Sequence, residues 1–289
     1  MLFAGALVAK DPLRVVATTG MVGDLAARVG GDRVEVEYLM GPGVDPHLYK
    51  ATASDVRKLQ RAEAILYNGL FLEGKMQTIL ERMQRGGRAV AAITAKLDHE
   101  LLLDPGDGSG HPDPHVWFDI ALWSQCVPVV VETLSLAAPE SADYFQQRAE
   151  TVTAELLQLH EWAKATIGQL APEKRILVTS HDAYGYFGEA YGFQVVGLQG
   201  ISTVSEAALA DMAGLVDFIR EQRVKAVFVE SSVPHATIER IATDAKVTIG
   251  GELFSDAMGT PGQIENGYDL GTYEGMVRHN ILTIVGALK

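Results

Sequence analysis

The sequence predicts an α/β protein made of two βα lobes, each with a parallel sheet, joined by one long helix. Short β-rich runs alternate with helical stretches from Val15 onward, which is typical of βαβ units and a parallel sheet. A single long helical pattern, Pro139 to Leu170, interrupts this alternation, and the alternation resumes beyond it. We therefore expect two lobes of the same plan, each with its own core.

The first lobe is expected to contain four short strands separated by helices. Its predicted strands are Val15–Thr18, Val34–Leu39, Ala64–Tyr67 and Ala89–Ile93, and its predicted helices are Met21–Val29, Thr52–Ala62, Leu72–Arg85 and Leu122–Ala137. Thr52 and Ser54 are candidate N-caps of the second helix. The loop from Thr94 to Pro114 is long for a compact domain, and loops of that length are usually functional or mobile.

The long helical pattern has one apolar face. Its apolar residues recur at alternating steps of four and three, at Phe145, Ala149, Val152, Leu156, Leu159 and Ala163. Pro139 lies near its start and Pro172 just past its end, as expected at helix boundaries. About 30 helical residues span roughly 45 Å, which is more than one small domain requires. This helix is therefore expected to link the two lobes, although one helix of a single larger domain is the alternative.

The second lobe repeats the plan of the first. Its predicted strands are Arg175–Thr179, Phe193–Leu198, Ala226–Glu230 and Val247–Ile249, and its predicted helices are Ala183–Tyr191, Ser205–Glu221 with Ser205 as cap, His235–Ala245 and Tyr273–Leu288. The predicted organisation is therefore an N-terminal lobe at 10–138, a linking helix at 139–171 and a C-terminal lobe at 172–289.

Composition narrows the function. A chain of 289 residues with 47% hydrophobic and 21% charged residues is globular and long enough for two modest domains. Its formal net charge of -13 argues against nucleic acid or an anionic membrane surface as partner. The single cysteine, Cys126, lies in an apolar helical run, which excludes a disulfide framework and indicates a small buried hydrophobic residue.

The first nine residues, 1–9, are apolar and rich in small residues, and the chain turns polar at Lys10-Asp11-Pro12. This pattern resembles the tail of a secretory signal, although it lacks a basic start and is short. A buried first strand is the alternative. We expect export through an N-terminal signal and a periplasmic or other extracytoplasmic location.

The tripeptide Asp-Pro-His occurs twice, at Asp45-Pro46-His47 and at Asp113-Pro114-His115. Each proline fixes its own φ and biases the Asp before it toward extended geometry, so each His leaves a stiff elbow. An imidazole held in this way suits a metal ion, and the neighbouring Asp could accept the ring N–H that faces away from the metal. A single elbow would more often carry a solvated His. The repetition makes the metal interpretation about as strong as that alternative.

Two further candidate ligands follow strands of the second lobe. His181 comes just after the strand Arg175–Thr179, and Asp256 lies after the last predicted strand. Ligands bind at the carboxyl edge of such sheets, where His47 is also expected. Four N/O ligands from four loops would make a closed site. Taken singly, His181 and Asp256 would more often be caps or solvated residues.

The loop Thr94–Pro114 offers additional groups that either collect metal or are simply solvated. They are Asp98, His99, Glu100, Asp104, Asp107 and His111.

Five segments carry a resemblance to a known family: Met40–His47, Leu66–Gly69, Asp113–Asp119, Thr179–Phe187 and Gly250–Gly259. Together they resemble the manganese/zinc solute-binding proteins of bacterial ABC importers, of the TroA type, from about Val15 to the C-terminus. The resemblance implies a C-clamp fold of two βα lobes joined by one backbone helix. It also implies that Zn²⁺ or Mn²⁺ is bound as cargo by the residues matching His47, His115, His181 and Asp256. Many manganese-type members carry Glu at the position of His181, whereas zinc-type and TroA-type members carry His, so both metals remain open.

The expected function is therefore capture of zinc or manganese outside the cytoplasmic membrane and delivery to an ABC-transporter membrane permease. We expect a monomer, with neither nucleic acid nor a small organic substrate as partner. The alternative is a zinc-dependent hydrolase in which Glu206, Glu230 or Glu252 acts as base. Catalytic zinc usually keeps an open position with three protein ligands, so four protein ligands favour transport.

Overall fold

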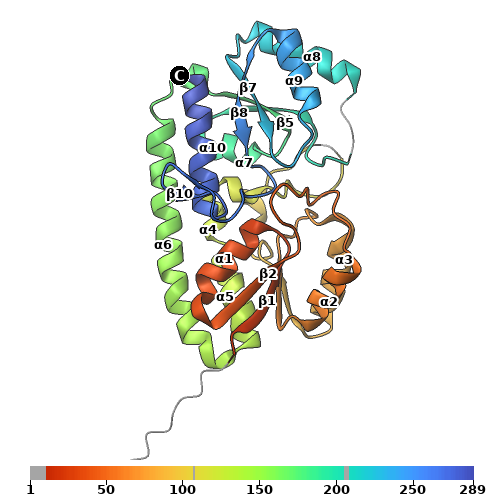
Figure 1. The fold of residues 1–289 in the computed structure, drawn as a ribbon, viewed down its shortest axis with the longest axis vertical. Helices are drawn as coiled ribbons and strands as arrows, with labels where there is room; N and C mark the ends of the chain where they lie inside the picture. Colours follow the sequence, from red (N-terminus) through yellow and green to blue (C-terminus); the bar gives the residue numbers. More distant parts are fainter. Residues whose placement is uncertain (1–10, 107, 205–207) are drawn as a thin grey trace, which may run out of the picture.

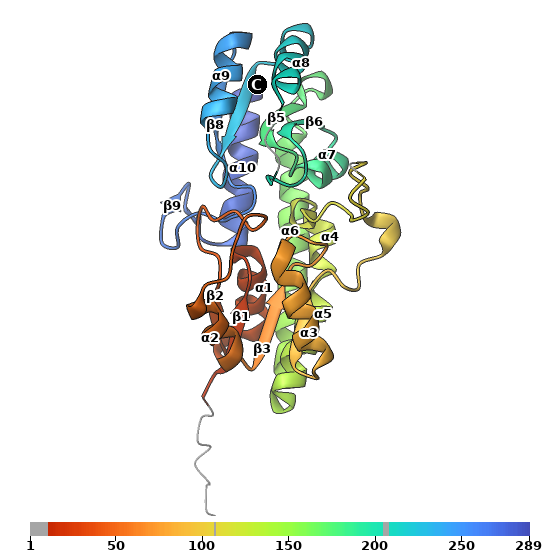
Figure 2. The same ribbon diagram turned by 90° about the vertical axis from the view of Figure 1, so that its right-hand side faces the viewer.

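The computed structural model describes residues 11–106, 108–204 and 208–289, and it confirms an α/β molecule of two lobes joined by a long helix. Figure 1 shows the lobes stacked along the long axis, with α6 (Ala142–Ile167) running along one side of both. In the view turned by 90°, the sheets lie in front of this helix (Figure 2). The expected signal segment, 1–9, lies outside the described residues, and the lobe boundaries at 138/139 and 171/172 stay predictions.

The N-terminal lobe is a parallel four-stranded sheet in the order β2-β1-β3-β4. The strands are β1 (Leu13–Ala17), β2 (Val34–Tyr38), β3 (Ala64–Tyr67) and β4 (Ala89–Ala92). Helices α1 (Gly20–Gly30) and α5 (Val127–Ala137) pack on one face, whereas α2 (Ala53–Arg61) and α3 (Gln77–Arg85) cover the other. Thr52 caps α2 in a reciprocal capping box with Asp55, as one of the two predicted caps.

The C-terminal lobe consists of two parallel pairs, β5 (Ile176–His181) with β6 (Gln194–Gln199), and β7 (Ala226–Glu230) with β8 (Thr248–Leu253). β5 lies beside β7, so the spatial order β6-β5-β7-β8 matches the order in the first lobe. The helices are α7 (Gly185–Tyr191), α8 (Leu209–Glu221), α9 (Ala236–Ala245) and α10 (Tyr273–Leu288). In both lobes the carboxyl ends of the central strands therefore lie at the seam between the lobes.

The apolar core corrects the expectation that each lobe has a core of its own. Smaller clusters do belong to single lobes, one under α2 and α3 and one between α8 and α9. The largest cluster, however, runs continuously from β1 and α1 through the buried face of α6 to α10. All six predicted apolar positions of α6 are buried in it. The lobes are therefore joined by packed side chains along their length as well as by the linking helix.

Several element boundaries differ from those predicted. The helix predicted at Leu122–Ala137 is broken into α4 (Ile120–Ser124) and α5, because Pro128 lacks an N–H and sits where a new helix starts. Residues 72–73 form a turn and Gly74–Met76 a short 3₁₀ helix, so α3 begins only at Gln77. The last strand continues through Gly250 and Gly251, and a two-stranded hairpin, β9 (Ile264–Glu265) with β10 (Tyr268–Asp269), follows it. The predicted cap Ser205 lies outside the described residues.

The stretch Ile120–Ala137 is also, among the described residues, the one segment that could cross a membrane by length and composition alone. It is interrupted between α4 and α5, and most of its apolar side chains are buried in the shared core against α6. Core helices of soluble proteins pass the same test of composition, and the packing here is of that kind. The free thiol of Cys126 is buried in this stretch, as predicted.

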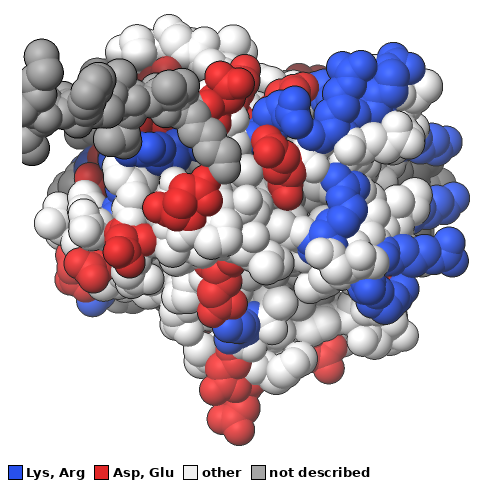
Figure 3. Space-filling view, turned by 90° about the horizontal axis from the view of Figure 1, so that it is seen from below, with Lys and Arg blue, Asp and Glu red and all other residues white. Residues whose placement is uncertain are grey.

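Charge is distributed unevenly over the surface. Figure 3 shows Lys and Arg gathered on one side of the lower end of the molecule, the side on which α2 and α3 lie in Figure 1. Exposed arginines on these two helices include Arg57, Arg61, Arg82 and Arg85. The net charge of -13 is therefore an average over the whole chain, and it does not reveal the basic face formed by α2 and α3.

Two neighbouring leucines of α6 test the role of the shared core. Leu156 is fully buried, whereas Leu157 is 45% exposed. Leu156→Ala should lower the free energy of unfolding by about 2–5 kcal/mol, because it opens a cavity in the core. Leu157→Ala is the matched control and should change it by less than about 0.5 kcal/mol. Urea denaturation followed by circular dichroism measures both, and equal effects would contradict the packing described.

Candidate metal centre

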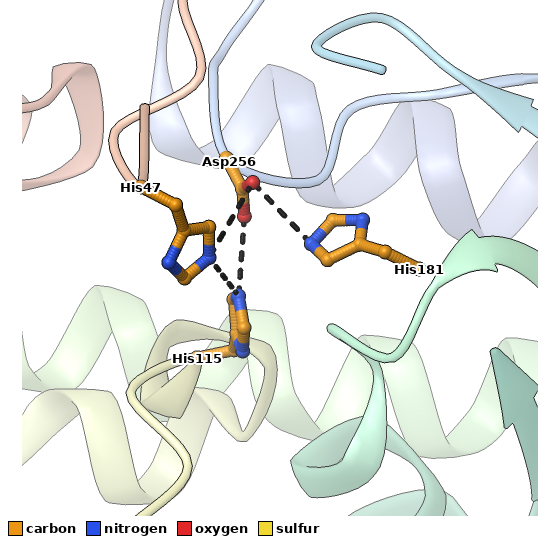
Figure 4. Close-up of side chains that lie close together, drawn as sticks. All are labelled: His47, His115, His181 and Asp256. Carbon is orange, nitrogen blue, oxygen red and sulfur yellow. Dashed lines mark hydrogen bonds and ion pairs between the residues drawn. The ribbon is translucent and has the colours of Figure 1, made fainter. Parts of the chain in front are cut away.

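Four side chains converge at the seam between the lobes, and they are the four predicted from the sequence. His47 and His115 belong to loops of the N-terminal lobe after β2 and β4, His181 is the last residue of β5, and Asp256 follows β8. One donor atom from each lies within 4.8 Å of all the others. Figure 4 shows the three imidazoles and the carboxylate pointing into a common centre. The carboxyl edges of both sheets thus supply two donors each.

Three of the distances between these donors equal the separation of ligands around a small cation. His115 Nε2 lies 3.3 Å from His47 Nε2 and 3.3 Å from Asp256 Oδ1. His181 Nε2 lies 3.3 Å from Asp256 Oδ2, and His47 Nε2 lies 3.9 Å from the same oxygen. Four ligands at the usual zinc distances are separated by about 3.3 Å in tetrahedral geometry. The spacing therefore fits a small cation held by three imidazoles and by one or both oxygens of Asp256.

The polar atoms at this centre are buried and incompletely satisfied. The side chains of His115, His181 and Asp256 are 0% exposed, and that of His47 is 4% exposed. Among the described residues, both carboxylate oxygens of Asp256 and Nε2 of His181 have no hydrogen-bond partner. Leaving such atoms buried without a partner destabilises the fold, and a bound cation would satisfy them together. The arrangement thus fits a metal ion better than a closed polar core.

The two Asp-Pro-His elbows have the same backbone arrangement. In each, the Asp Oδ1 accepts a hydrogen bond from the backbone N–H of the His two residues on, at 2.8 Å for Asp45 and 2.9 Å for Asp113. This Asx turn closes around the proline and fixes the direction in which the His leaves. The repeated tripeptide therefore encodes a repeated local structure.

The acids of the two elbows differ in their second contact, and one prediction is corrected. Asp113 Oδ1 also lies 2.7 Å from His115 Nδ1, as predicted for an acceptor that orients the ring. Asp45 Oδ2 instead accepts a hydrogen bond of 2.5 Å from Thr203 Oγ1, in the opposite lobe. Asp45 thus links the His47 elbow to the C-terminal lobe, because its second carboxylate oxygen binds Thr203 across the seam.

Glu230 orients His181, a role that the sequence did not reveal. It ends β7 next to β5, so its Oε1 accepts the His181 backbone N–H at 2.9 Å and its Oε2 lies 2.5 Å from His181 Nδ1. Each buried imidazole, His115 and His181, therefore has a carboxylate on its outer nitrogen and Asp256 near its inner one. The sequence signal for this role was an acidic residue at the end of a fully buried strand, because a buried carboxylate needs a charged or hydrogen-bonding partner.

Charges at the centre set the protonation of the three histidines. Burial alone would lower the pKa of His115, but Asp113 and Asp256 outweigh it and raise the pKa to about 9. Glu230 and Asp256 likewise outweigh burial and hold the pKa of His181 well above its usual value. Burial, reinforced by the neighbouring imidazoles, lowers the pKa of His47 to about 3. The imidazolium neighbours keep the pKa of Asp256 well below its usual range despite its burial. Without a cation, these shifts favour the protonated forms of His115 and His181 near neutral pH.

The other candidates from the sequence lie elsewhere. His99 is exposed, and the ring of His111 stacks on Phe71 at a centroid distance of 4.4 Å. Neither histidine joins the converging group in the described part of the chain. Of the possible hydrolytic bases, Glu252 is exposed on β8, Glu230 is engaged with His181, and Glu206 lies outside the described residues.

Aromatic side chains hold the seam closed around the centre. Trp117 Nε1 donates to the Ser255 carbonyl at 3.1 Å, and Tyr273 Oη donates to the Trp117 carbonyl at 2.6 Å. Tyr184 Oη donates to the Phe254 carbonyl at 3.1 Å. Because Ser255 precedes Asp256 and Trp117 follows His115 closely, the bonds between Trp117 and Ser255 and between Tyr273 and Trp117 fix donors of opposite lobes relative to each other. The Tyr184 bond holds the segment before Asp256 within the C-terminal lobe.

Two lobes that face each other across a buried group of candidate cation ligands are typical of a solute-binding protein for a small cation. The chain belongs to the family described as zinc-uptake complex component A, periplasmic, whose model matches residues 15–287. It is thus the binding component of a metal importer of the ABC type and not an enzyme, and the hydrolase alternative finds no support.

Individual relatives agree with this assignment over nearly the whole chain. The manganese-binding lipoprotein MntA of Bacillus subtilis is 46% identical over 286 residues, covering 97% of this chain and 91% of that protein. The zinc-binding protein TroA of Treponema pallidum is 47% identical over 281 residues, covering 95% and 88%. The solved structure of periplasmic zinc-binding TroA from Treponema pallidum superposes with a TM-score of 0.89 at 45% identity, covering 96% of this chain and 99% of that one. The resemblance noted in the sequence is confirmed.

Zinc binding to the metal-free protein near pH 7 should release about two protons, because His115 and His181 must each give up the proton on the nitrogen that faces the metal. Affinity should rise with pH, by about a hundredfold per unit while both groups remain protonated. His47, with its pKa near 3, should contribute no proton in this range. Calorimetry in two buffers of different ionisation enthalpy counts the protons, and a count of zero would contradict the charge arrangement.

Proposed function

We propose that this chain captures zinc or manganese outside the cytoplasmic membrane by coordinating it with His47, His115, His181 and Asp256, and delivers it to a membrane permease. The observation that carries the proposal is the convergence of these four side chains. Three of the distances between their donor atoms are 3.3 Å. Both oxygens of Asp256 and Nε2 of His181 are buried without a hydrogen-bond partner in the described structure. The names of the relatives support both metals, since MntA is described as manganese-binding and TroA as zinc-binding.

The donor set favours zinc at equilibrium. Three neutral imidazoles and one carboxylate suit the four-coordinate geometry of zinc, and the Irving–Williams order places zinc above manganese at such a site. Manganese remains a possible cargo, because Asp256 could coordinate through both oxygens and because availability also decides which metal is loaded.

Export and assembly complete the proposal. We infer that an N-terminal signal to which residues 1–9 belong directs export, in keeping with relatives that are described as lipoproteins. We also infer that the protein acts as a monomer, since both lobes of one chain supply the donors.

Replacing one donor tests the site directly. His115→Ala should weaken zinc binding by more than about a hundredfold, because even outer-shell changes cost 10–100-fold. Zinc at a hundred times the wild-type dissociation constant should stabilise the wild-type protein by about 2.7 kcal/mol and leave His115→Ala nearly unshifted in thermal melts. His99→Ala, in the exposed loop, is the control and should behave as wild type. A normal zinc response of His115→Ala would refute the assignment.

The shared core also predicts how far the lobes move. A hinge that opened widely would expose side chains of the apolar cluster that joins α1, α6 and α10. Metal-free and zinc-loaded protein should therefore have nearly the same radius of gyration in small-angle scattering. A large compaction on adding zinc would contradict this rigidity.

A further inference from the structure

The turn formed by residues 68–74 follows β3 and touches both Asp-Pro-His elbows. Asn68 Nδ2 donates to the carbonyl of Pro114 at 3.0 Å, directly before His115. A Cβ atom placed on Gly74 would lie 3.6 Å from the carbonyl oxygen of His47. The turn therefore rests against the backbone that carries each donor of the N-terminal lobe.

The backbone of this turn is strained. Gly69, Leu70 and Phe71 have φ angles of 89°, 53° and 69°, so three successive residues adopt left-handed conformations and two of them are not glycine. Non-glycine residues in this region are disfavoured and persist only where their surroundings hold them in place. Something adjacent must therefore maintain the turn.

A buried carboxylate supplies that restraint. Glu73 is 1% exposed, and it accepts hydrogen bonds from the backbone N–H groups of Asn68 at 2.6 Å and Gly69 at 3.1 Å. Thr18 Oγ1, just after β1, donates to the same carboxylate at 2.8 Å. An ionised carboxylate only accepts hydrogen bonds, so it matches three donors without conflict. Glu73 thus fastens the start of the turn to the centre of the sheet.

The outer side of the turn lines a cavity that also borders His47. Leu70, Phe71 and Gly74 line a cavity of about 180 Å³ whose wall includes His47. Phe71 also stacks on His111 from the long loop, with ring planes only 2° apart. Displacement of this turn would consequently alter the surroundings of His47 as well as the support of His115.

We propose that Glu73 is a positioning residue that fixes the His47 and His115 elbows through the 68–74 turn, and thereby favours four-coordinate zinc over manganese. The proposal rests on the function proposed above. Donors held at separations of 3.3 Å match zinc, whereas manganese prefers more ligands around a larger coordination sphere. Elbows that could relax would weaken zinc binding and reduce this preference.

The variant Glu73→Gln tests the proposal with little change of shape. Its amide must direct N–H groups toward at least one backbone N–H, of Asn68 or Gly69, so the turn loses a hydrogen bond and relaxes. We expect zinc to dissociate about tenfold faster, at the lower end of the effects of outer-shell residues. The ratio of zinc to manganese affinity should fall as well. Stopped-flow release into excess chelator measures the rate, and competition titration measures the ratio.

Asp55→Asn is the matched control for loss of a buried carboxylate in the same lobe. Asp55 is 5% exposed and accepts from Tyr49 Oη and from the Thr52 backbone N–H, each at 2.7 Å. None of its hydrogen bonds in the described structure reaches an elbow. This variant should lower the melting temperature while leaving the zinc dissociation rate and the metal ratio at wild-type values.

A second variant guards against failure of Glu73→Gln to fold. Asn68→Ala removes the bond to the Pro114 carbonyl but keeps the backbone N–H groups that Glu73 holds. It should change the dissociation rate and the metal ratio in the same direction as Glu73→Gln. If folded Glu73→Gln, or in its absence Asn68→Ala, keeps both wild-type values, the positioning role is overturned. Wild-type protein that binds neither metal would instead refute the proposed function.

Discussion

The structure depends on one buried carboxylate placed among three imidazoles. Asp256 has both oxygens buried without a hydrogen-bond partner in the described residues, and His115 and His181 approach it to 3.3 Å. A carboxylate in such a place is tolerated only when cations surround it. The raised pKa values of His115 and His181 favour imidazolium partners for it, and a divalent ion bound at this point would meet the same need. The rest of the fold brings these groups from four separate loops to one point.

That convergence requires the two lobes to keep a fixed relation. Donors in one lobe alone could be aligned by a single sheet, but here His47 and His115 must meet His181 and Asp256 across the seam. The continuous apolar cluster and the hydrogen bonds made by Trp117 and Tyr273 supply this relation. Close-packed cores resist gradual deformation, so small changes at the site are expected to be local rather than to spread into a wide hinge. Rigidity of the frame is thus a condition for the spacing of the donors.

The sequence predicted the parts of this site that are encoded locally and failed where tertiary pairing decides. Both elbows were identifiable because a proline and an Asx turn act within three residues. Placement after parallel strands located His181 and Asp256. The role of Glu230 was not predicted, because it depends on β7 lying next to β5. Asp45 was predicted to accept the ring N–H of His47, whereas its Oδ2 accepts a hydrogen bond from Thr203 of the other lobe. The lobe-spanning core and the basic face of α2 and α3 likewise arise from tertiary packing, which composition and periodicity do not predict.

The four candidate donors differ in their burial and in the contacts that hold them. Asp113 orients the ring of His115, Glu230 orients the ring of His181, and Asp256 is fully buried between them. His47 retains 4% side-chain exposure, and its elbow is joined to the opposite lobe through the bond between Asp45 and Thr203. It also borders the cavity lined by Leu70 and Phe71. His47 therefore differs from the other three in two ways, because it borders a cavity and because its elbow is held by the opposite lobe rather than by its own. Its position thus depends on the relation between the lobes, which the shared apolar core maintains.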